Sequence, residues 1–145
     1  MISSSNSLLD TNVLSEYQRR RPDSGVIEFL GQLGFQSTFL SVVTLSEIRF
    51  GIERLPRGTR RERFDHWLSW ELPLEFRDRI LPVSEAVAET AGLIRASAMD
   101  TGRPMAVMDA LIAASAQVHG LTLITRNVKD FAAWGGPILN PWKVV

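Results

Sequence analysis

The stretch Ser7–Glu16, SLLDTNVLSE, decides the fold. Its apolar start predicts a short buried strand over Ser7–Leu9, and its second apolar pair predicts a helix from about Val13. Asp10 falls between the two, where an aspartate either caps the helix or belongs to a charged site. Taken alone, the stretch favours the cap.

Beyond this stretch, short apolar runs alternate with longer helical patterns. The further strands that we expect are 39–43, 80–83, 121–125 and 137–139. The further helices that we expect are 28–33, a segment from Thr44 or Ser46 to about 55, then 59–75, 85–100 and 109–119. Strands separated by helices indicate a parallel sheet covered on both faces. The pattern therefore predicts a three-layer α/β/α domain with four to five parallel strands.

Length and composition narrow the class of protein. The 145 residues suit one domain, which we place at 8–145 after a polar lead at 1–7. The sequence has no cysteine, which excludes disulfides, thiolate metal sites and cysteine nucleophiles. No apolar run approaches the roughly 20 residues that span a bilayer, and no signal peptide is evident. We therefore expect a cytoplasmic protein without a membrane partner.

The charges balance, but the basic residues are of one kind. Sixteen Lys and Arg residues face sixteen Asp and Glu residues, so no general polybasic field is present. Nearly all the basic residues are arginines, and they cluster at 19–21 and 54–63. Arginine is well suited to bind phosphate or carboxylate groups. A solvated surface and a phosphate- or partner-binding surface are equally good interpretations of these clusters.

Acidic residues from distant parts of the chain map to one edge of the predicted sheet, beyond the carboxyl ends of its strands, where ligands bind. Asp10 ends the first strand, and Glu47 lies one turn into the helix after the second. Asp109 opens the helix that leads to the fourth strand, which Asn127 and Asp130 follow.

Each of these residues also has a structural interpretation. Glu47 matches a capping box with Thr44, and Asp130 suits the cap of a short turn. Together, however, crowded carboxylates repel one another unless a cation is present. Oxygen ligands without His or Cys select Mg²⁺ or Mn²⁺, which suits phosphodiester cleavage by an activated water.

Other catalytic classes have little support. Only His66 and His119 are available to a metal-free nuclease, and no nucleophile elbow, P-loop or dinucleotide fingerprint is present. A phosphatase with an aspartyl nucleophile needs a second Asp two residues after Asp10, where this chain has Asn12.

Four segments in register resemble PIN-domain toxins of the VapC type, and the FitB-like branch most of all. They are LLDTNVLSE, VVTLSEIRFG, MDALIAASAQVHGLTLITRNVKDF and ILNPW, which together reach from Leu8 to Trp142. The resemblance implies an α/β/α fold, an acidic cluster that binds Mg²⁺ or Mn²⁺, and RNA cleavage. It also implies a homodimer and a small antitoxin that blocks the site and carries a DNA-binding segment.

The resemblance also assigns positions. The family's acids fall on Asp10, Glu47 and Asp109, while its fourth position falls on Asn127, where many relatives have Asp. Asp130 lies three residues further on and is a candidate replacement. The family's small polar positions, which orient ligands or water, fall on Thr11, Asn12 and Thr125.

We therefore expect an endoribonuclease toxin in which Asp10 and Asp109 are the main metal ligands. Glu47 would bind metal directly or through water, or act as the general base, and Asn127 would orient the water or a phosphate. Two alternatives remain. One is a weakly catalytic or inactive module that serves as the dimeric partner of a DNA-binding antitoxin, and the other is a DNA nuclease with the same chemistry.

Overall fold

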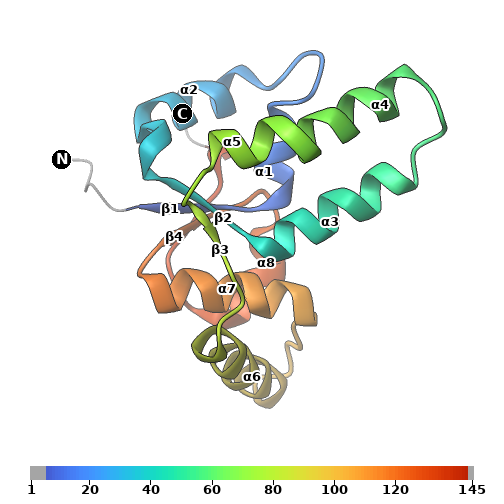
Figure 1. The fold of residues 1–145 in the computed structure, drawn as a ribbon. Helices are drawn as coiled ribbons and strands as arrows, with labels where there is room; N and C mark the ends of the chain where they lie inside the picture. Colours follow the sequence, from blue (N-terminus) through green and yellow to red (C-terminus); the bar gives the residue numbers. More distant parts are fainter. Residues whose placement is uncertain (1–5, 144–145) are drawn as a thin grey trace.

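The computed structural model describes residues 6–143, so most of the predicted polar lead lies outside the described residues. Five parallel strands form one sheet in the order β3-β2-β1-β4-β5. They are β1 (Ser7–Leu9), β2 (Thr38–Ser41), β3 (Ile80–Leu81), β4 (Thr122–Ile124) and β5 (Ile138–Leu139). Helices cover both faces of this sheet (Figure 1), which confirms the three-layer α/β prediction.

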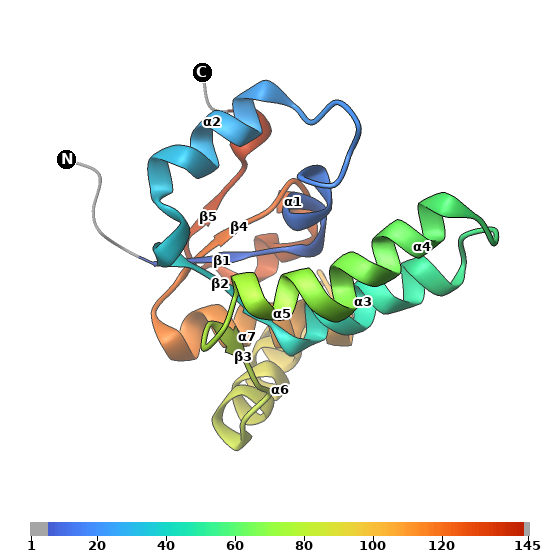
Figure 2. The same cartoon turned by 45° about the horizontal axis from the view of Figure 1, so that its top comes forward.

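The helices are α1 (Thr11–Glu16), α2 (Ser24–Leu33), α3 (Val42–Glu53), α4 (Thr59–His66), α5 (Leu72–Glu75), α6 (Glu85–Asp100), α7 (Val107–His119) and α8 (Val128–Phe131). Single 3₁₀ turns lie at Phe35–Ser37, Ala132–Trp134 and Pro141–Lys143. Figure 2 shows α3 and α4 side by side as a pair that extends away from the sheet. No helix within residues 6–143 has the length and apolar character needed to cross a membrane.

The pleat of the strands separates two apolar cores. Leu8 and Leu123 pair in register and point to the face covered by α6 and α7. Their neighbours Leu9 and Ile124 point to the opposite face, which α1, α2 and α3 cover. Because successive strand residues alternate between faces, both sides of the short central strands are apolar. This burial holds the end of β1, and hence Asp10, in a fixed position.

The boundary between β2 and α3 differs from the prediction. We expected a strand through Val43 and a cap at Thr44 or Ser46, but the helix begins at Val42. The reason is Ser41, whose Oγ accepts a hydrogen bond of 3.0 Å from the Val43 N–H and so caps the helix. The β-branched pair that suggested a strand is tolerated in the first turn of a helix because this cap starts it.

Several other boundaries move by a few residues. Helix α1 begins at Thr11, α2 already begins at Ser24, where Asp23 caps it, and α7 begins at Val107. Strand β3 is shorter than expected, since Pro82 follows it directly. The predicted helix over 59–75 is continuous, but a π turn over Trp67–Glu71 joins α4 to α5. Trp67, Leu68 and Leu72 are all buried there.

Candidate active site

Asp10 is almost fully buried at the carboxyl end of β1, and donors surround its carboxylate. Its Oδ2 accepts hydrogen bonds from the Thr125 hydroxyl at 2.7 Å and from the Asn12 amide at 3.2 Å. Its Oδ1 accepts the Thr11 N–H at 2.8 Å, so Asp10 is also the N-cap of α1. Burial raises the pKa of Asp10. The hydrogen bonds from Thr125, Thr11 and Asn12 lower it and so offset part of the cost of burying the charge.

Thr11 connects Asp10 to Glu47. Its backbone N–H donates to Asp10, and its hydroxyl donates to Glu47 Oε1 at 2.8 Å. Burial is the main cause that raises the pKa of the Glu47 carboxyl, and the charge of Asp10 adds to it. The alternative interpretation of Glu47, a capping box with Thr44, is wrong, because α3 begins at Val42 and Ser41 caps it. Thr44 Oγ1 is buried and has no hydrogen-bond partner within residues 6–143.

Asp109 lies in the first turn of α7, where the negative charges of the other acids repel its carboxylate. Partial burial, followed by the charges of Asp10, Asp130 and Glu47, raises its pKa to about 6. Asp10 follows β1, and the other three acids lie on α3, α7 and α8, so the fold places all four at the sheet edge that the sequence pattern indicated. Their mutual repulsion is the electrostatic state expected of a site that gathers negative charge.

Asn127 and Asp130 occupy different positions around the fourth strand. The Asn127 N–H donates to Thr125 Oγ1 at 3.0 Å, and its carbonyl accepts the Asp130 N–H at 3.0 Å. The charge of Asp130 raises the pKa of both Asp10 and Asp109. Asn127 is thus joined to the site through its backbone, whereas Asp130 acts on it through charge. The short helix α8 that carries Asp130 was not expected from the sequence.

Asn12 ties α1 to the end of β4. Its amide donates to Asp10 and to Thr125 Oγ1, and its Oδ1 accepts the Arg126 N–H at 3.0 Å. Thr125 Oγ1 therefore contacts Asp10, Asn12 and the Asn127 backbone at once. Thr11, Asn12 and Thr125, the three small polar residues named from the sequence, thus form one hydrogen-bond network with Asp10 and Glu47.

The donor set suits a hard divalent cation. In the part of the chain that the structure describes, no group of three or more Asp, Glu or His side chains is close enough together to surround one ion. Mg²⁺ needs less than that, because it is often held by one or two carboxylates and keeps several waters. Oxygen-only ligands with a surplus of negative charge therefore fit Mg²⁺ or Mn²⁺.

Two hollows flank the acids. One, of about 490 Å³, is lined by Thr11 and Glu47 together with Arg19, Arg60 and Phe64 among others. The other, of about 310 Å³, contains Asp109 and Asp130 beside Arg103 and Lys129. Sequence reasoning did not single out Arg103 or Lys129. The adjacency of Lys129 to Asp130 in the chain was the one available signal.

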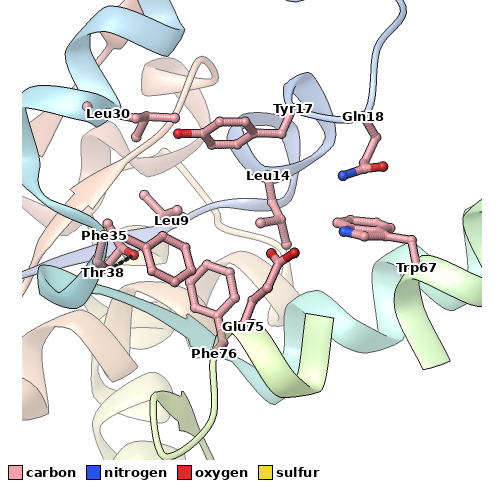
Figure 3. Close-up of a pocket in the computed structure, with 11 residues that line it drawn as sticks. Leu9, Leu14, Tyr17, Gln18, Leu30, Phe35, Thr38, Trp67, Glu75 and Phe76 are labelled. Atoms are coloured by element: carbon pink, nitrogen blue, oxygen red, sulfur yellow. Dashed lines mark hydrogen bonds between the residues drawn. The ribbon is translucent and has the colours of Figure 1, made fainter. Parts of the chain in front are cut away.

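An apolar cavity of about 430 Å³ lies between α1, α2 and the π turn (Figure 3), and sequence reasoning missed it as well. Its walls include Leu14, Leu30 and Phe76, and Glu75 brings a carboxylate to it. Next to it, the buried Arg79 guanidinium stacks on the Phe35 and Phe76 rings, 4.5 and 4.9 Å from their centres. Arg79 also donates to the carbonyl of Phe35 at 2.8 Å.

Comparison with known proteins gives a consistent result. The model of the PIN domain family matches residues 7–135. Toxin FitB of Neisseria gonorrhoeae is 37% identical over 93% of this chain and 97% of its own length, and VapC ribonuclease Y4jK of Sinorhizobium fredii is 34% identical over 94% and 97%.

Solved structures agree. The crystal structure of FitAcB from Neisseria gonorrhoeae superposes with a TM-score of 0.88 and 36% identity, covering 94% of this chain and 99% of that one. A toxin–antitoxin complex from Klebsiella pneumoniae has a TM-score of 0.68 and 30% identity, covering 96% and 100%.

Proposed function

This chain belongs to the PIN-domain family, among the VapC-type toxins, and from that premise we propose that it is a Mg²⁺- or Mn²⁺-dependent endoribonuclease that acts in the cytoplasm as the toxin of a toxin–antitoxin pair. The observation that carries the proposal is the partly buried Asp109, whose pKa three other acids help to raise to about 6. Crowded carboxylates destabilise a fold by repelling one another, and a bound cation removes this repulsion.

Asp10 and Asp109 would hold the metal, and Glu47 would bind it directly or through water. When bound, the ion lowers the pKa of the attacking water and stabilises charge on the leaving oxygen. Thr125 and Asn12 orient Asp10 by their hydrogen bonds, and Thr11 orients Glu47. These contacts hold the carboxylates before substrate arrives, which is what precise positioning of a site requires.

Glu47 is also the candidate general base. Its Oε1 accepts the Thr11 hydroxyl, which leaves Oε2 to take the proton of the attacking water. Burial raises its pKa, so it is a better proton acceptor than an ordinary carboxylate. Asn127 would orient that water or a substrate phosphate, and Asp130 would contribute charge. The cut is a single water attack without a covalent enzyme intermediate.

The test is cleavage of structured RNA by the purified protein with Mg²⁺ or Mn²⁺, beside an Asp10→Asn variant. Asp100→Asn, at the exposed end of α6, is the matched control. We expect the parent and the control to cleave, Asp10→Asn to be inactive, and EDTA to stop all cleavage. Equal cleavage by the parent and by Asp10→Asn would overturn the proposal. A DNA strand of the same sequence tests the DNA-nuclease alternative, since a metal site contacts phosphates rather than sugars.

The apolar cavity favours a second function, that of antitoxin partner, and one of the similar solved structures is a toxin–antitoxin complex. An apolar segment with a basic residue would suit a cavity that also contains Glu75. Coexpression with the product of the neighbouring reading frame tests this. We expect Tyr17→Ala and Phe35→Ala, both half-exposed at the cavity, to weaken copurification, and the Arg95→Ala control to leave it unchanged. The expected homodimer is tested by the mass of the purified protein in light scattering.

A further inference from the structure

We propose that five arginines form a binding site for the phosphate backbone of the RNA strand that enters the active site. The site, here called the arginine hollow, consists of Arg19, Arg20, Arg21, Arg60 and Arg63, and its volume is about 710 Å³. Gln18, Thr59 and Phe64 complete its lining, so no acidic residue is part of it. The proposal deepens the function proposed above and rests on it.

One wall of the arginine hollow is the turn after α1, which Glu16 holds in place. The Glu16 carboxylate is buried, and its Oε2 accepts the Asp23 N–H at 2.6 Å. Its Oε1 lies 3.5 Å from the Arg19 guanidinium, which is itself mostly exposed. The acid thus closes a loop between residues 16 and 23, and this loop presents three consecutive arginines in a fixed place.

The other wall is one face of α4. Arg60 and Arg63 both lie against the Phe64 ring, 5.7 and 5.5 Å from its centre. Such cation–π contact holds a guanidinium in place without neutralising it. Arg60 lies three residues before Arg63 and four before Phe64, so it shares a helix face with both, while Arg63 reaches the ring from the adjacent position.

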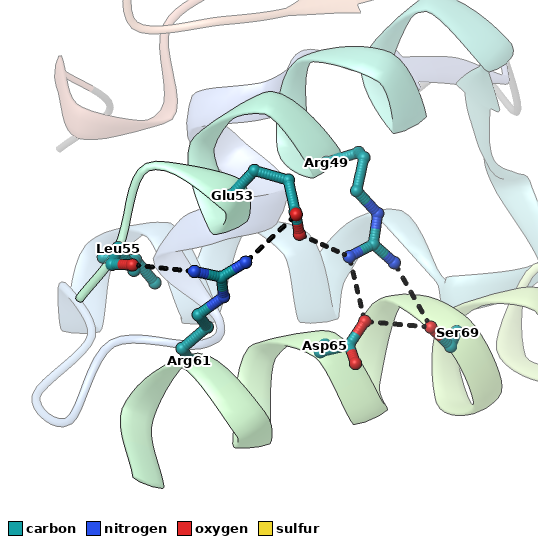
Figure 4. Close-up of polar contacts among 6 residues, drawn as sticks. All are labelled: Arg49, Glu53, Leu55, Arg61, Asp65 and Ser69. Carbon is teal, nitrogen blue, oxygen red and sulfur yellow. Dashed lines mark hydrogen bonds and ion pairs between the residues drawn. The ribbon is translucent and has the colours of Figure 1, made fainter. Parts of the chain in front are cut away.

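Two other arginines lie between α3 and α4 instead: Arg61 of α4 turns toward α3, and Arg49 of α3 turns toward α4 (Figure 4). Arg61 donates to Glu53 Oε1 at 3.0 Å and to the Leu55 carbonyl at 3.2 Å, and Arg49 pairs with Asp65 at 2.9 Å. The sequence cluster 54–63 is therefore not one surface. Within residues 6–143, Arg19 alone of the five hollow arginines has an acidic partner within ion-pair distance.

The arginine hollow continues into the active site. Arg19, Arg60 and Phe64 also line the hollow of about 490 Å³ that contains Thr11 and Glu47. A strand whose scissile phosphate lies at the acids can therefore follow one depression to the five guanidinium groups. The hollow on the far side of the acids differs, because Asp109 and Asp130 offset Arg103 and Lys129 there.

This continuity favours a phosphodiester strand over an acidic protein segment. One guanidinium group can donate two parallel hydrogen bonds to a phosphate. Such phosphate contacts position a strand and do not depend on its sequence. In a chain with no net charge, this local concentration of arginines supplies an attractive field for RNA. For single strands, each phosphate contact contributes about 0.7 to the slope of log affinity against log salt.

The test measures binding apart from cleavage. The full chain with Asp10→Asn, in EDTA, is titrated onto a fluorescent single-stranded RNA over a range of KCl concentrations. Adding R20Q, R60Q and R63Q should lower the affinity about tenfold or more and make the salt slope shallower by about 2, because three contacts are lost. The matched control carries R54Q, R77Q and R95Q, three exposed arginines outside the hollow, and should keep the slope.

An unchanged affinity and slope in the hollow variant would overturn the proposal, provided that its thermal melt matches that of its parent. So would a variant that keeps RNA binding but loses binding to polyglutamate, because the hollow would then be a site for an acidic protein. The two proposals fail separately. If the unmodified protein does not cleave RNA but the hollow variant loses RNA binding, the proposed function is wrong and the proposed binding site stands. If the unmodified protein cleaves RNA and the hollow variant binds RNA normally, the proposed function stands and the proposed binding site is wrong.

Discussion

Asp109 shows how a single side chain links stability to function. It begins the apolar stripe of α7 that Ile112 and Ala113 continue, and it faces three other acids. Its charged form is therefore disfavoured until a cation arrives. For a carboxyl whose pKa is raised by folding, burying the charge costs stability above the folded pKa and nothing below the unfolded pKa.

The first prediction concerns stability. With a pKa of about 6 in the folded chain and an ordinary value of 3.8, the cost from Asp109 grows as pH rises through this window. We expect Asp109→Asn, without metal, to add about 1 kcal/mol to the free energy of unfolding at pH 7.5, after discounting for solvent screening. That is a rise in melting temperature of about 3 °C. At pH 3.5 the melting temperatures should agree, and a difference that persists there would contradict the assignment.

The second prediction concerns cleavage. A protonated carboxyl is a poor metal ligand, so cleavage with saturating RNA should fall as pH decreases through about 6. Raising Mn²⁺ should move this limb to lower pH, since metal and proton compete for the same oxygens. A limb that stays in place across a hundredfold range of Mn²⁺ would show that another group is responsible.

At the scale of the element, the start of α3 decides where Glu47 points. Ser41 caps the helix, and Glu47 then falls in its second turn, where it meets Thr11. A helix starting at Thr44 would instead have engaged Glu47 in its own cap. The sequence contains both caps, and the choice between them depends on how the buried strand β2 ends.

The third prediction uses this pair of hydroxyls. Ser41→Ala removes the bond to the Val43 N–H and should cost about 1 kcal/mol of folding stability. Thr44→Val removes a buried hydroxyl without a partner and should leave stability unchanged or increase it. Chemical denaturation of both variants decides the matter. A larger loss for Thr44→Val would restore the capping box that the sequence suggested.

For the whole molecule, the parallel sheet and its acidic edge could be predicted because the buried strands are apolar on both faces and alternate with helices along the chain. Asp10, Glu47 and Asp109 follow from that topology. The short helix α8 and the cavity beside Tyr17 could not be predicted, because they depend on contacts between distant segments. The same holds for the division of the arginines between two faces of α4, which only the packing of α4 on α3 determines.

The fourth prediction concerns the folded chain as a receptor for metal. A cation that binds only the folded state stabilises it by about 2.7 kcal/mol at a hundred times its dissociation constant, or about 5–10 °C in melting temperature. We expect Mn²⁺ to produce such a rise in the parent and Asp109→Asn to abolish it. Absence of a rise in the parent would favour the function of antitoxin partner without catalysis.

The π turn at Trp67–Glu71 has an evolutionary consequence. Such a turn contains one residue more than an α turn, so a helix can gain a residue there while the flanking segments keep their orientation. An alignment with relatives should therefore place a one-residue gap at this point, while the helices on either side align without further gaps. The arginines of α4 and the core contacts of α5 could then have diversified independently of each other.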